Sequence, residues 1–370
     1  MNKKHNILIC PLEWGLGHST RMIYLAGRLL EMGNNIIIGA GKEYHQLFKD
    51  ELPGVSCITF NGFKPRYSGF LPQYFILLLK TPFLIYHIFR EHNRLKKIIE
   101  KHKIDIVISD NRFGLWNKKV KTVYVTHMPR IPLPKALRFI EIAGILMHRK
   151  IIKKYSYCFI PDLPGELNIS GRLSHGLKLP DNVRFTGIIS RFMLHLSPPA
   201  KSTSISKHNT IILSGPEPQR GILKRQLAVI FKGKEITTVV LEGRADKDRE
   251  IRKDGNILYY THLPSSEMKP MIKESENIIT RSGYTSIMDL ISLNCSALLI
   301  PTPGQTEQEY LAAYLSERGW FDTMNQGQLK EDINLPLKRT IPSAEIIEQS
   351  NLLLDKALME LLKDSHKEIL

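Results

Sequence analysis

A histidine beside two glycines is the first group in this sequence that could do acid–base chemistry. Gly15, Gly17 and His18 lie in a turn between an apolar run at residues 7–10, typical of a buried parallel strand, and a helix predicted over residues 21–32. Glycines let a ligand approach the backbone, and a helix N-terminus attracts negative charge. A histidine at this position is a candidate general base, because imidazole titrates close to neutral pH.

The same turn does not match the dinucleotide-binding fingerprint. That fingerprint requires glycine or alanine where Thr20 stands, and an acidic residue after the next strand, which we expect at residues 36–39. The residues that follow this strand are Ala40 and Gly41 instead. The sequence therefore disfavours a nicotinamide-dependent dehydrogenase and favours a substrate-binding loop.

A carboxylate at the end of another apolar run could assist the histidine. Asp110 follows the strand predicted at residues 104–108, and the carboxyl ends of parallel strands meet at one edge of a sheet. Asp110 paired with His18 would form a general base for a hydroxyl group. Asp110 could equally cap the segment that follows it. His127, which also follows an apolar run, and Glu13 are reserve candidates.

A second group of small and polar residues follows the strand predicted at residues 277–280 and opens a helix. Accessible backbone N–H groups and the helix dipole suit a diphosphate there. A carboxylate about two turns along could accept hydrogen bonds from a ribose diol. A capped helix with an exposed Asp289 is the alternative interpretation. The candidate residues are Arg281, Ser282, Gly283, Thr285, Ser286 and Asp289.

A third group follows the strand predicted at residues 297–301, in a loop stiffened by two prolines and a glycine. A carboxylate and an amide at the start of the next helix can bind several sugar hydroxyls. The helix dipole alone also favours acidic residues at that position. The candidate residues are Gly304, Gln305, Glu307 and Gln308.

Strands that alternate with helices predict two doubly wound α/β domains, with a ligand-binding cleft between the carboxyl ends of their sheets. A polar segment rich in proline and serine at residues 196–204 marks the connection between them. We expect an N-terminal domain at residues 1–190, a linker at 191–208, a C-terminal domain at 209–342 and a terminal helix at 343–370.

Taken together, the second and third groups resemble the donor-binding half of GT-B glycosyltransferases, and they are most similar to the MurG family of peptidoglycan N-acetylglucosaminyltransferases. The likeness lies in their order, in their spacing of about 20 residues, and in their chemistry. It covers the whole chain in architecture and is specific mainly over residues 260–315. The matching positions are Arg281, Gly283, Asp289 and Glu307-Gln308, with Gly15, Gly17 and His18 in the N-terminal loop.

The resemblance implies two Rossmann-like domains that face a central cleft. The C-terminal domain would bind a nucleotide-diphosphate sugar, for which the family favours UDP, and the N-terminal domain a lipid-linked or glycan acceptor. His18, assisted by Asp110, would remove the acceptor proton, and the hydroxyl would attack with inversion. The helix that starts near Ser282 would stabilise the leaving diphosphate, so we expect no metal and no cofactor besides the nucleotide sugar.

The sequence departs from the family at the start of the second domain. A Gly-Gly-Ser loop is common there, whereas this chain has Ser214 and Gly215 followed by two prolines, which lack N–H groups. Ser214 and Gly215 can still present backbone, and Arg220 can reach a phosphate.

The resemblance also implies that backbone groups of His262 and Leu263 contact the nucleotide base. Asp289 in place of a glutamate, and an altered sugar-binding pair, leave the identity of the donor sugar open.

The excess positive charge of the chain is confined to its first half. The formal net charge is +16; residues 1–190 contain 29 Lys and Arg against 13 Asp and Glu, whereas residues 191–370 contain 23 of each. The apolar stretch at residues 70–89 and the basic residues after it are typical of an interfacial helix on anionic lipid. A buried helix with a solvated basic end is the alternative. The sequence shows no basic–aromatic recognition module, so we expect no nucleic-acid partner.

The cysteines and the apolar runs of the sequence bear on where in the cell the protein is located. The four cysteines have neither metal-ligand nor redox spacing, which fits a reducing compartment. We find no signal-peptide pattern and no uninterrupted apolar run of ~18 residues. We therefore expect a cytoplasmic protein that is peripheral on the inner face of the cell membrane.

Two other functions stay open at this point. Nucleotide-sugar 2-epimerases share the expected architecture, and a protein of this kind could also bind a nucleotide sugar without catalysis. An epimerase needs no apolar, basic acceptor face, so a membrane-pelleting assay would separate it from a transferase. A pure binding protein would bind the donor without hydrolysing or transferring it.

Overall fold

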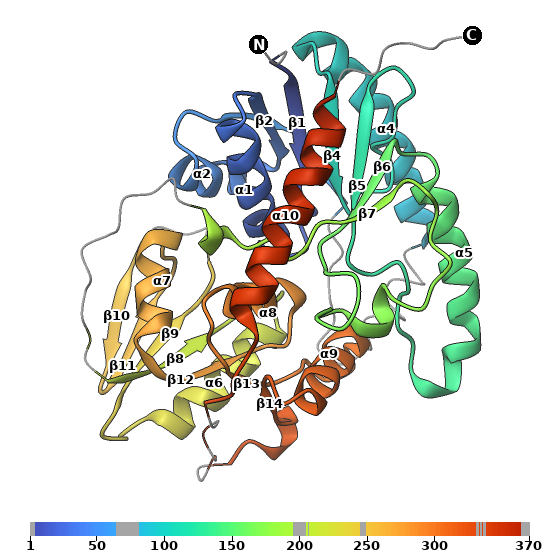
Figure 1. The fold of residues 1–370 in the computed structure, drawn as a ribbon. Coiled ribbons are helices and arrows are strands. Elements are labelled where there is room, and N and C mark those ends of the chain that lie inside the picture. Colours follow the sequence, from blue (N-terminus) through green and yellow to red (C-terminus); the bar gives the residue numbers. More distant parts are fainter. Residues whose placement is uncertain are drawn as a thin grey trace.

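The protein contains two seven-stranded sheets that follow one another along the chain, each flanked by helices (Figure 1). The computed structural model describes residues 4–63, 81–194, 205, 207–244, 249–330, 333, 335 and 338–363. Most of the expected linker, and the apolar run at residues 70–79, lie outside these ranges. Two such sheets, each flanked by helices, confirm the predicted fold class of two Rossmann-like domains.

The first sheet has the strand order β3-β2-β1-β4-β5-β6-β7, and every pairing in it is parallel. The apolar residues of β1 alternate between its two faces: Ile7 and Ile9 pack with α1 and α2, whereas Leu8 packs with α4. The strands are β1 (Asn6–Cys10), β2 (Asn35–Ala40), β3 (Ser56–Thr59), β4 (Ile106–Asp110), β5 (Lys121–Val125), β6 (Tyr157–Ile160) and β7 (Val183–Phe185). The helices are α1 (Leu16–Glu31), α2 (Lys42–Glu51), α4 (Thr81–His102) and α5 (Glu141–Ile152), with the 3-10 helices η1 (Lys135–Ile140), η2 (Gly171–Leu173) and η3 (Arg191–Met193).

The second sheet has the order β10-β11-β9-β8-β12-β13-β14 and is parallel except for the β10–β11 pair. The strands are β8 (His208–Ile212), β9 (Thr237–Leu241), β10 (Ile251–Asp254), β11 (Ile257–Tyr260), β12 (Ser275–Thr280), β13 (Leu298–Leu299) and β14 (Asp322–Thr323). The helices are α6 (Gln219–Phe231), α7 (Ser265–Lys273), α8 (Tyr284–Ser292), α9 (Thr306–Glu317), η4 (Gln326–Gln328) and α10 (Ser343–Leu362).

The last helix returns to the first domain. Figure 1 shows α10 running from the second sheet up along the first one. Leu354, Leu358 and Leu361 on this helix are fully buried in the core that lies under α1. The terminal helix predicted from the sequence begins at the expected residue, and the described part of it ends at Leu362.

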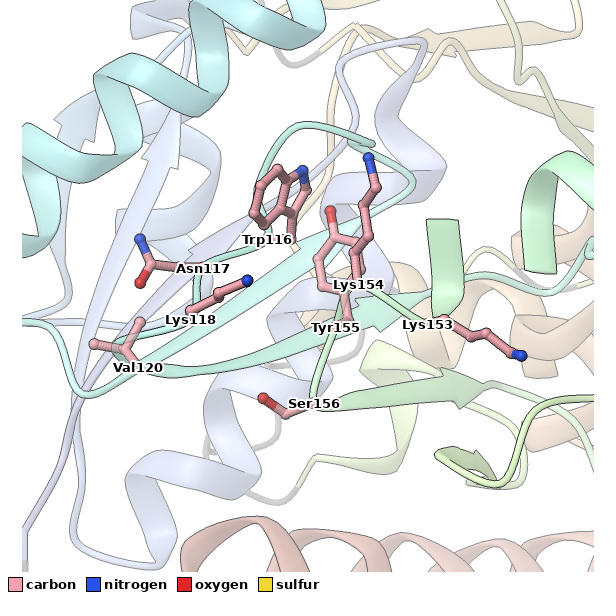
Figure 2. A pocket seen from close by; sticks show the side chains of 8 residues that line it. All are labelled: Trp116, Asn117, Lys118, Val120, Lys153, Lys154, Tyr155 and Ser156. Carbon is pink, nitrogen blue, oxygen red and sulfur yellow. The ribbon is translucent and has the colours of Figure 1, made fainter. Parts of the chain in front are cut away.

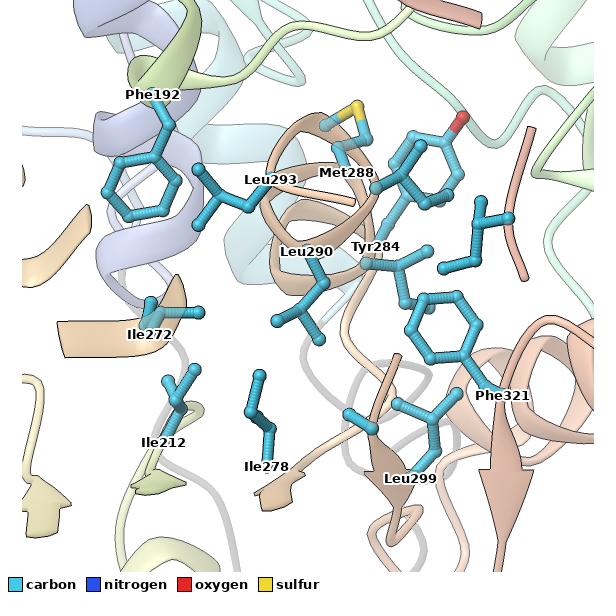
Figure 3. Close-up of a cluster of buried hydrophobic side chains, with 14 of the residues drawn as sticks. Phe192, Ile212, Ile272, Ile278, Tyr284, Met288, Leu290, Leu293, Leu299 and Phe321 are labelled. Carbon is cyan, nitrogen blue, oxygen red and sulfur yellow. The ribbon is translucent and has the colours of Figure 1, made fainter. Parts of the chain in front are cut away.

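One apolar core runs across the boundary between the two sheets. It includes Leu163, Ile169 and Leu173 from the first half of the chain together with Tyr284 and Met288 on α8. Figure 3 shows part of this core. The chain passes between the domains through η3, whose Phe192 is buried in the same cluster (Figure 3). The domains are therefore packed on each other through a dry core.

Sequence patterns located the central strands but missed four edge or short strands. β3, β7, β10 and β14 carry little apolar signal, and three residues of β10 are charged. Helix α1 begins at Leu16, five residues earlier than predicted, so His18 lies inside its first turn. Among the described residues, no helix is long and apolar enough to cross a membrane.

We predict that α10 stabilises the first domain through its buried leucines. Leu358→Ala should lower the free energy of unfolding by about 2–5 kcal/mol, because it leaves a cavity in a closed core. Leu352→Ala, on the same helix but 67% exposed, should change it by less than about 0.5 kcal/mol. Urea unfolding followed by circular dichroism measures both, and equal effects of the two substitutions would show that α10 is not docked.

Candidate active site between the two domains

His18 and Asp110 meet at the carboxyl end of the first sheet. β1 and β4 are neighbours in register, so the turn after β1 lies beside the last residue of β4. His18 Nδ1 lies 2.9 Å from Asp110 Oδ2. The predicted pairing of these two side chains is therefore present in the structure, and the cap that we considered as the alternative role of Asp110 is not needed to explain it.

Arg21 is a third member of this group, and sequence reasoning passed over it. Its Nε donates to Asp110 Oδ2 at 2.9 Å, and its Nη2 donates to Oδ1 of the same carboxylate. Nη2 also lies 2.9 Å from His18 Nδ1. An ionised carboxylate only accepts hydrogen bonds, so we assign the Nδ1 proton to the bond with Asp110; the Arg21 contact at Nδ1 is then not a hydrogen bond, and Nε2 keeps its lone pair. Arg21 is 1% exposed. One signal could have found it: Arg21 follows His18 by three residues, and residues three apart share a face of a helix.

The charges of the group follow from burial and pairing. Burial alone would favour a neutral Asp110, but the Arg21 guanidinium and then His18 outweigh it and lower the pKa of Asp110 to about 2. Burial lowers the pKa of His18, and Arg21 acts in the same direction while Asp110 opposes them. At neutral pH the group therefore holds an ionised carboxylate and a neutral imidazole. The His18 side chain is 21% exposed, and among the described residues its Nε2 has no hydrogen-bond partner.

His127 joins this group to the second domain. Its Nδ1 lies 3.3 Å from Arg21 Nη1, and its Nε2 lies 2.8 Å from Glu307 Oε1 in the first turn of α9. Its ring stacks on Tyr284 of α8 with centroids 4.2 Å apart and an interplanar angle of 8°. The reserve candidate His127 and the predicted sugar-binding residue Glu307 are thus direct partners.

Glu13, the other reserve candidate, holds backbone together. Its carboxylate accepts hydrogen bonds from the N–H groups of Gly41 and Gly62, and the residue is buried. Both oxygens are therefore engaged in joining the loops after β2 and β3. This arrangement gives Glu13 a structural role in the first domain.

Two helix N-termini converge across the domain boundary. A Cβ atom on Gly17, in the first turn of α1, would lie 3.1 Å from Thr285 Oγ1 in the first turn of α8. A Cβ atom on Gly283 would lie 4.0 Å from Ser214 Oγ in the loop after β8. Gly15 and Gly215 have positive φ angles of 134° and 89°, which turn these loops. Ser286 follows in the same turn of α8. Converging helix N-termini favour an anion, so the predicted diphosphate site is compatible with this arrangement and stays a prediction.

Several predicted donor-site residues instead shape the loops around this region. The buried Arg281 guanidinium donates to the carbonyl oxygens of Ile300, Pro301 and Gln219 at 3.1–3.2 Å. Burial lowers its pKa to about 10. Ser282 Oγ donates to the carbonyl of Gln308 at 2.8 Å.

The remaining residues of the loop after β13 and the loop after β8 are held in the same way. Gln308 Oε1 accepts from Thr302 N at 2.9 Å, and Gly304 N donates to Glu309 Oε1 at 2.9 Å. Gln305 N donates to the carbonyl of Thr302. Arg220 donates to Glu217 and to the carbonyl of Gly243, and Leu263 is buried in the core. The side chains of Gln308 and Arg220 and the backbone N–H groups of Gly304 and Gln305 thus hold these loops, and donor binding by these residues stays a prediction.

A cluster of incompletely paired groups lies where η3 meets the second domain. Asp289 accepts from Ser190 Oγ at 2.6 Å and lies 3.7 Å from Arg191 Nε. Burial raises the pKa of Asp289 to about 6, although Arg191 and Ser190 act against it. Burial and the nearby Arg191 lower the pKa of His262 to about 4. Among the described residues, Arg191 Nε and His262 Nε2 are buried without a hydrogen-bond partner. Buried polar atoms of this kind require an explanation, and a bound ligand is one of those possible. Sequence reasoning did not single out Arg191.

A hollow of about 520 Å³ lies away from this region (Figure 2). It is lined by Trp116, Lys118, Lys153, Lys154 and their neighbours, at the amino ends of β5 and β6. Because the His18 group lies at the carboxyl ends of the strands, this hollow is not part of the candidate site.

The described residues contain no group of three or more His, Cys, Asp or Glu side chains placed to hold a metal ion. The sequence has one Asp-x-Asp triplet, Asp246-Lys247-Asp248, which lies outside the described ranges. Independence from metal therefore stays a prediction.

Comparisons with known proteins agree with this fold. Residues 224–336 match the glycosyltransferase family 28 C-terminal domain. An uncharacterized glycosyltransferase from Methanosarcina acetivorans is 23% identical over 85% of this chain and 84% of its own length. One from Methanosarcina mazei is 21% identical over the same shares.

Solved structures show the same fold across nearly the whole chain. The glycosyltransferase of kitacinnamycin has a TM-score of 0.59 at 12% identity and covers 98% of this chain and 94% of its own. The calicheamicin glycosyltransferase CalG4 has a TM-score of 0.57 at 12% identity, with 96% and 94% covered. A putative UDP-N-acetylglucosamine 2-epimerase from Listeria monocytogenes has a TM-score of 0.56 at 12% identity, with 97% and 90% covered. Together with the family match, these likenesses show the GT-B fold over nearly the whole chain and a glycosyltransferase family 28 C-terminal domain in its second half, and they support the resemblance to MurG-like glycosyltransferases.

Proposed function

We propose that this protein transfers a hexose from a nucleotide-diphosphate sugar, with UDP as the favoured nucleotide, to a hydroxyl group of a lipid-linked or glycan acceptor. The observation that carries the proposal is the His18–Asp110 pair beside the converging N-termini of α1 and α8. A neutral imidazole with a free nitrogen and a region that attracts a diphosphate are the two groups that such a transfer needs.

The geometry supports an inverting reaction. His18 Nε2 takes the proton of the acceptor hydroxyl while the oxygen forms a bond to the anomeric carbon. The bond from that carbon to the diphosphate breaks on the opposite face, and the diphosphate leaves with the electron pair. Asp110 orients the imidazole and stabilises its charged form. The N-termini of α1 and α8 stabilise the charge that develops on the diphosphate, so the proposal requires no metal ion.

The incompletely paired cluster near η3 is proposed as the nucleoside site. Asp289 is 13% exposed and can exchange Ser190 for a ribose diol, and His262 and Arg191 offer nitrogen atoms that lack partners. A buried carboxylate whose ionisation is unfavourable has a reason to be retained if it binds a ligand. The fold of the putative 2-epimerase keeps epimerisation as the alternative function, and binding without catalysis as a second one.

Two exposed apolar surfaces support an acceptor at a membrane. α4 exposes Phe83, Tyr86 and Phe89, and η1 with α5 exposes Phe139 and Ile142. The cores under α4 and α5 include Val107 and Tyr124, which point to the same face of the first sheet, so both helices cover that face. Basic residues accompany both surfaces: Arg90, Arg94, Lys96 and Lys97 on α4, and Arg149 and Lys150 on α5. Aromatic side chains beside cations suit an anionic lipid surface, which we propose as the inner face of the cell membrane.

We predict that Asp289→Asn weakens nucleotide binding without destabilising the free protein. In a thermal-shift screen with UDP, GDP and dTDP, one nucleotide should stabilise the wild type, and the substitution should remove most of that shift, because an amide accepts fewer hydrogen bonds from a diol. No shift with any of these nucleotides on the wild type would contradict the proposed function.

The same substitution should make the free protein more stable at pH 7.5. The folded-state pKa of Asp289 is raised to about 6 from 3.8, so its protonated form contributes stability below pH 3.8 that is lost as the pH rises through 6. Asn cannot ionise, so it avoids a cost of up to about 3 kcal/mol. The gain should shrink below pH 5 in urea unfolding; a pH-independent difference would show that the charge of Asp289 is not its cause.

We predict that His18 sets the acidic limb of the pH–rate profile. His18→Ala should slow hydrolysis of the bound nucleotide sugar by about 10²–10⁴-fold without loss of nucleotide binding. Because the pKa of His18 is lowered from 6.5, the limb of the wild type should lie below pH 6.5. Arg21→Gln removes a cation that lowers this pKa and should move the limb to higher pH. Arg28→Gln, which changes an arginine on the same helix that pairs with Asp355, should leave it in place.

We predict that the protein sediments with vesicles of phosphatidylglycerol and much less with phosphatidylcholine, and that salt weakens binding. Phe89 and Phe139 are 66% and 73% exposed. Changing both to serine should weaken vesicle binding by at least about tenfold, from the lost burial of two large apolar groups. Leu352→Ser on α10 is the matched control. Equal sedimentation of all three proteins would exclude these surfaces as the membrane contact.

A further inference from the structure

His127 lies between the two domains with both ring nitrogens engaged. Nδ1 faces Arg21 Nη1 at 3.3 Å, and Nε2 faces Glu307 Oε1 at 2.8 Å. The side chain is 6% exposed, and its ring lies flat on Tyr284. The stack and the two polar contacts together leave the ring one orientation.

The chemistry of the neighbours fixes the proton on this ring. A guanidinium only donates hydrogen bonds, so Nδ1 accepts from Arg21 and Nε2 carries a proton. Nε2 then donates to the Glu307 carboxylate. Since neither nitrogen keeps a free lone pair, His127 cannot act as a general base in this arrangement, and His18, with its open Nε2, keeps that role.

Glu307 is held by one oxygen. Burial alone would raise its pKa, but the neighbouring His127 outweighs burial and keeps the pKa of Glu307 below its usual value, so the carboxylate is ionised. Oε1 is the oxygen bound to His127. The contact next to it is also interdomain, because Thr306 Oγ1 donates to the carbonyl of Pro132 at 2.7 Å. The start of α9 is thus fastened to the loop after β5 at two adjacent points.

We propose that His127 is a positioning residue for the donor sugar, supplied by the domain that does not bind the nucleotide. By holding Oε1 of Glu307, and being held itself by Arg21 and Tyr284, it directs the second carboxylate oxygen to the hydroxyl groups of the sugar. The proposal rests on the function proposed above. It implies that the sugar is held only when the two domains are in contact. It also implies that Arg21 positions both the His18–Asp110 pair and, through His127, the carboxylate of Glu307.

Two substitutions separate the hydrogen bonds of His127 from its packing. His127→Phe keeps a ring on Tyr284 but has no nitrogen. His127→Gln gives up the ring but offers an amide N–H toward Glu307 and a carbonyl oxygen toward Arg21. His175→Phe is the matched control, because His175 pairs with Asp162 at 3.1 Å and stacks on Phe185 within the first domain.

The measurement is the ratio of dissociation constants for a nucleotide sugar and its nucleotide, by calorimetry with UDP-glucose and UDP, GDP-mannose and GDP, and dTDP-glucose and dTDP. For the pair that the wild type binds, His127→Phe should weaken sugar-nucleotide binding by about tenfold, as expected for a charge-assisted hydrogen bond. Binding of the nucleotide alone should be unchanged. His127→Gln should recover most of the loss, and His175→Phe should show none.

Each outcome bears on one proposal. An unchanged ratio in His127→Phe, or an equal loss for nucleotide and nucleotide sugar, overturns the positioning role and leaves the proposed function standing. A loss in His127→Gln as large as in His127→Phe also overturns it, because the stack would then carry the effect. Failure of the wild type to bind any of the nucleotides overturns the proposed function itself, and the positioning role with it.

Discussion

The buried ion pair between Arg21 and Asp110 is the interaction on which the rest of the site depends. Both groups are almost fully excluded from solvent, and two charges removed from water are tolerated only when nearly every hydrogen-bonding atom has a partner. Asp110 meets this condition through Arg21 and His18, and Arg21 through Asp110 and His127. Because the buried Arg21 guanidinium must keep its hydrogen-bond partners, it fixes the first turn of α1, the end of β4 and the ring of His127 at the same time.

The two domains contribute to the site in physically different ways. The first supplies His18, Asp110 and Arg21, which contact one another. The second supplies groups with unmet needs: Asp289 carries a charge that its surroundings disfavour, and Arg191 and His262 bury nitrogen atoms that lack acceptors or donors among the described residues. Such groups reduce stability in the free protein. A ligand that completes them recovers this free energy on binding.

Sequence patterns predicted the class of fold, the central strands and the meeting of His18 with Asp110, because each follows from apolar runs and from the common edge of parallel strands. They could not predict what the polar side chains do once folded. Arg281 reads as a phosphate ligand next to a glycine, yet its guanidinium is used by three carbonyl groups. Arg21 reads as an ordinary helix residue, yet it is the centre of the site. The partner of a buried charge can come from a distant segment, as Glu307 and His127 show, which are 180 positions apart in the sequence. No local sequence pattern contains that information.

The path of the chain also sets how the two domains can move. It crosses between them twice, once through η3 at residues 191–193 and again before α10, which ends in the core of the first domain. A body attached at two points keeps one easy motion, a rotation about the line that joins them. We therefore expect the two domains to open by rotating about the axis through these two crossings. Sliding and twisting of one domain against the other would be opposed by both connecting segments. A fragment cut at the first crossing would leave the first domain without α10, so neither half of this chain is a complete folding unit.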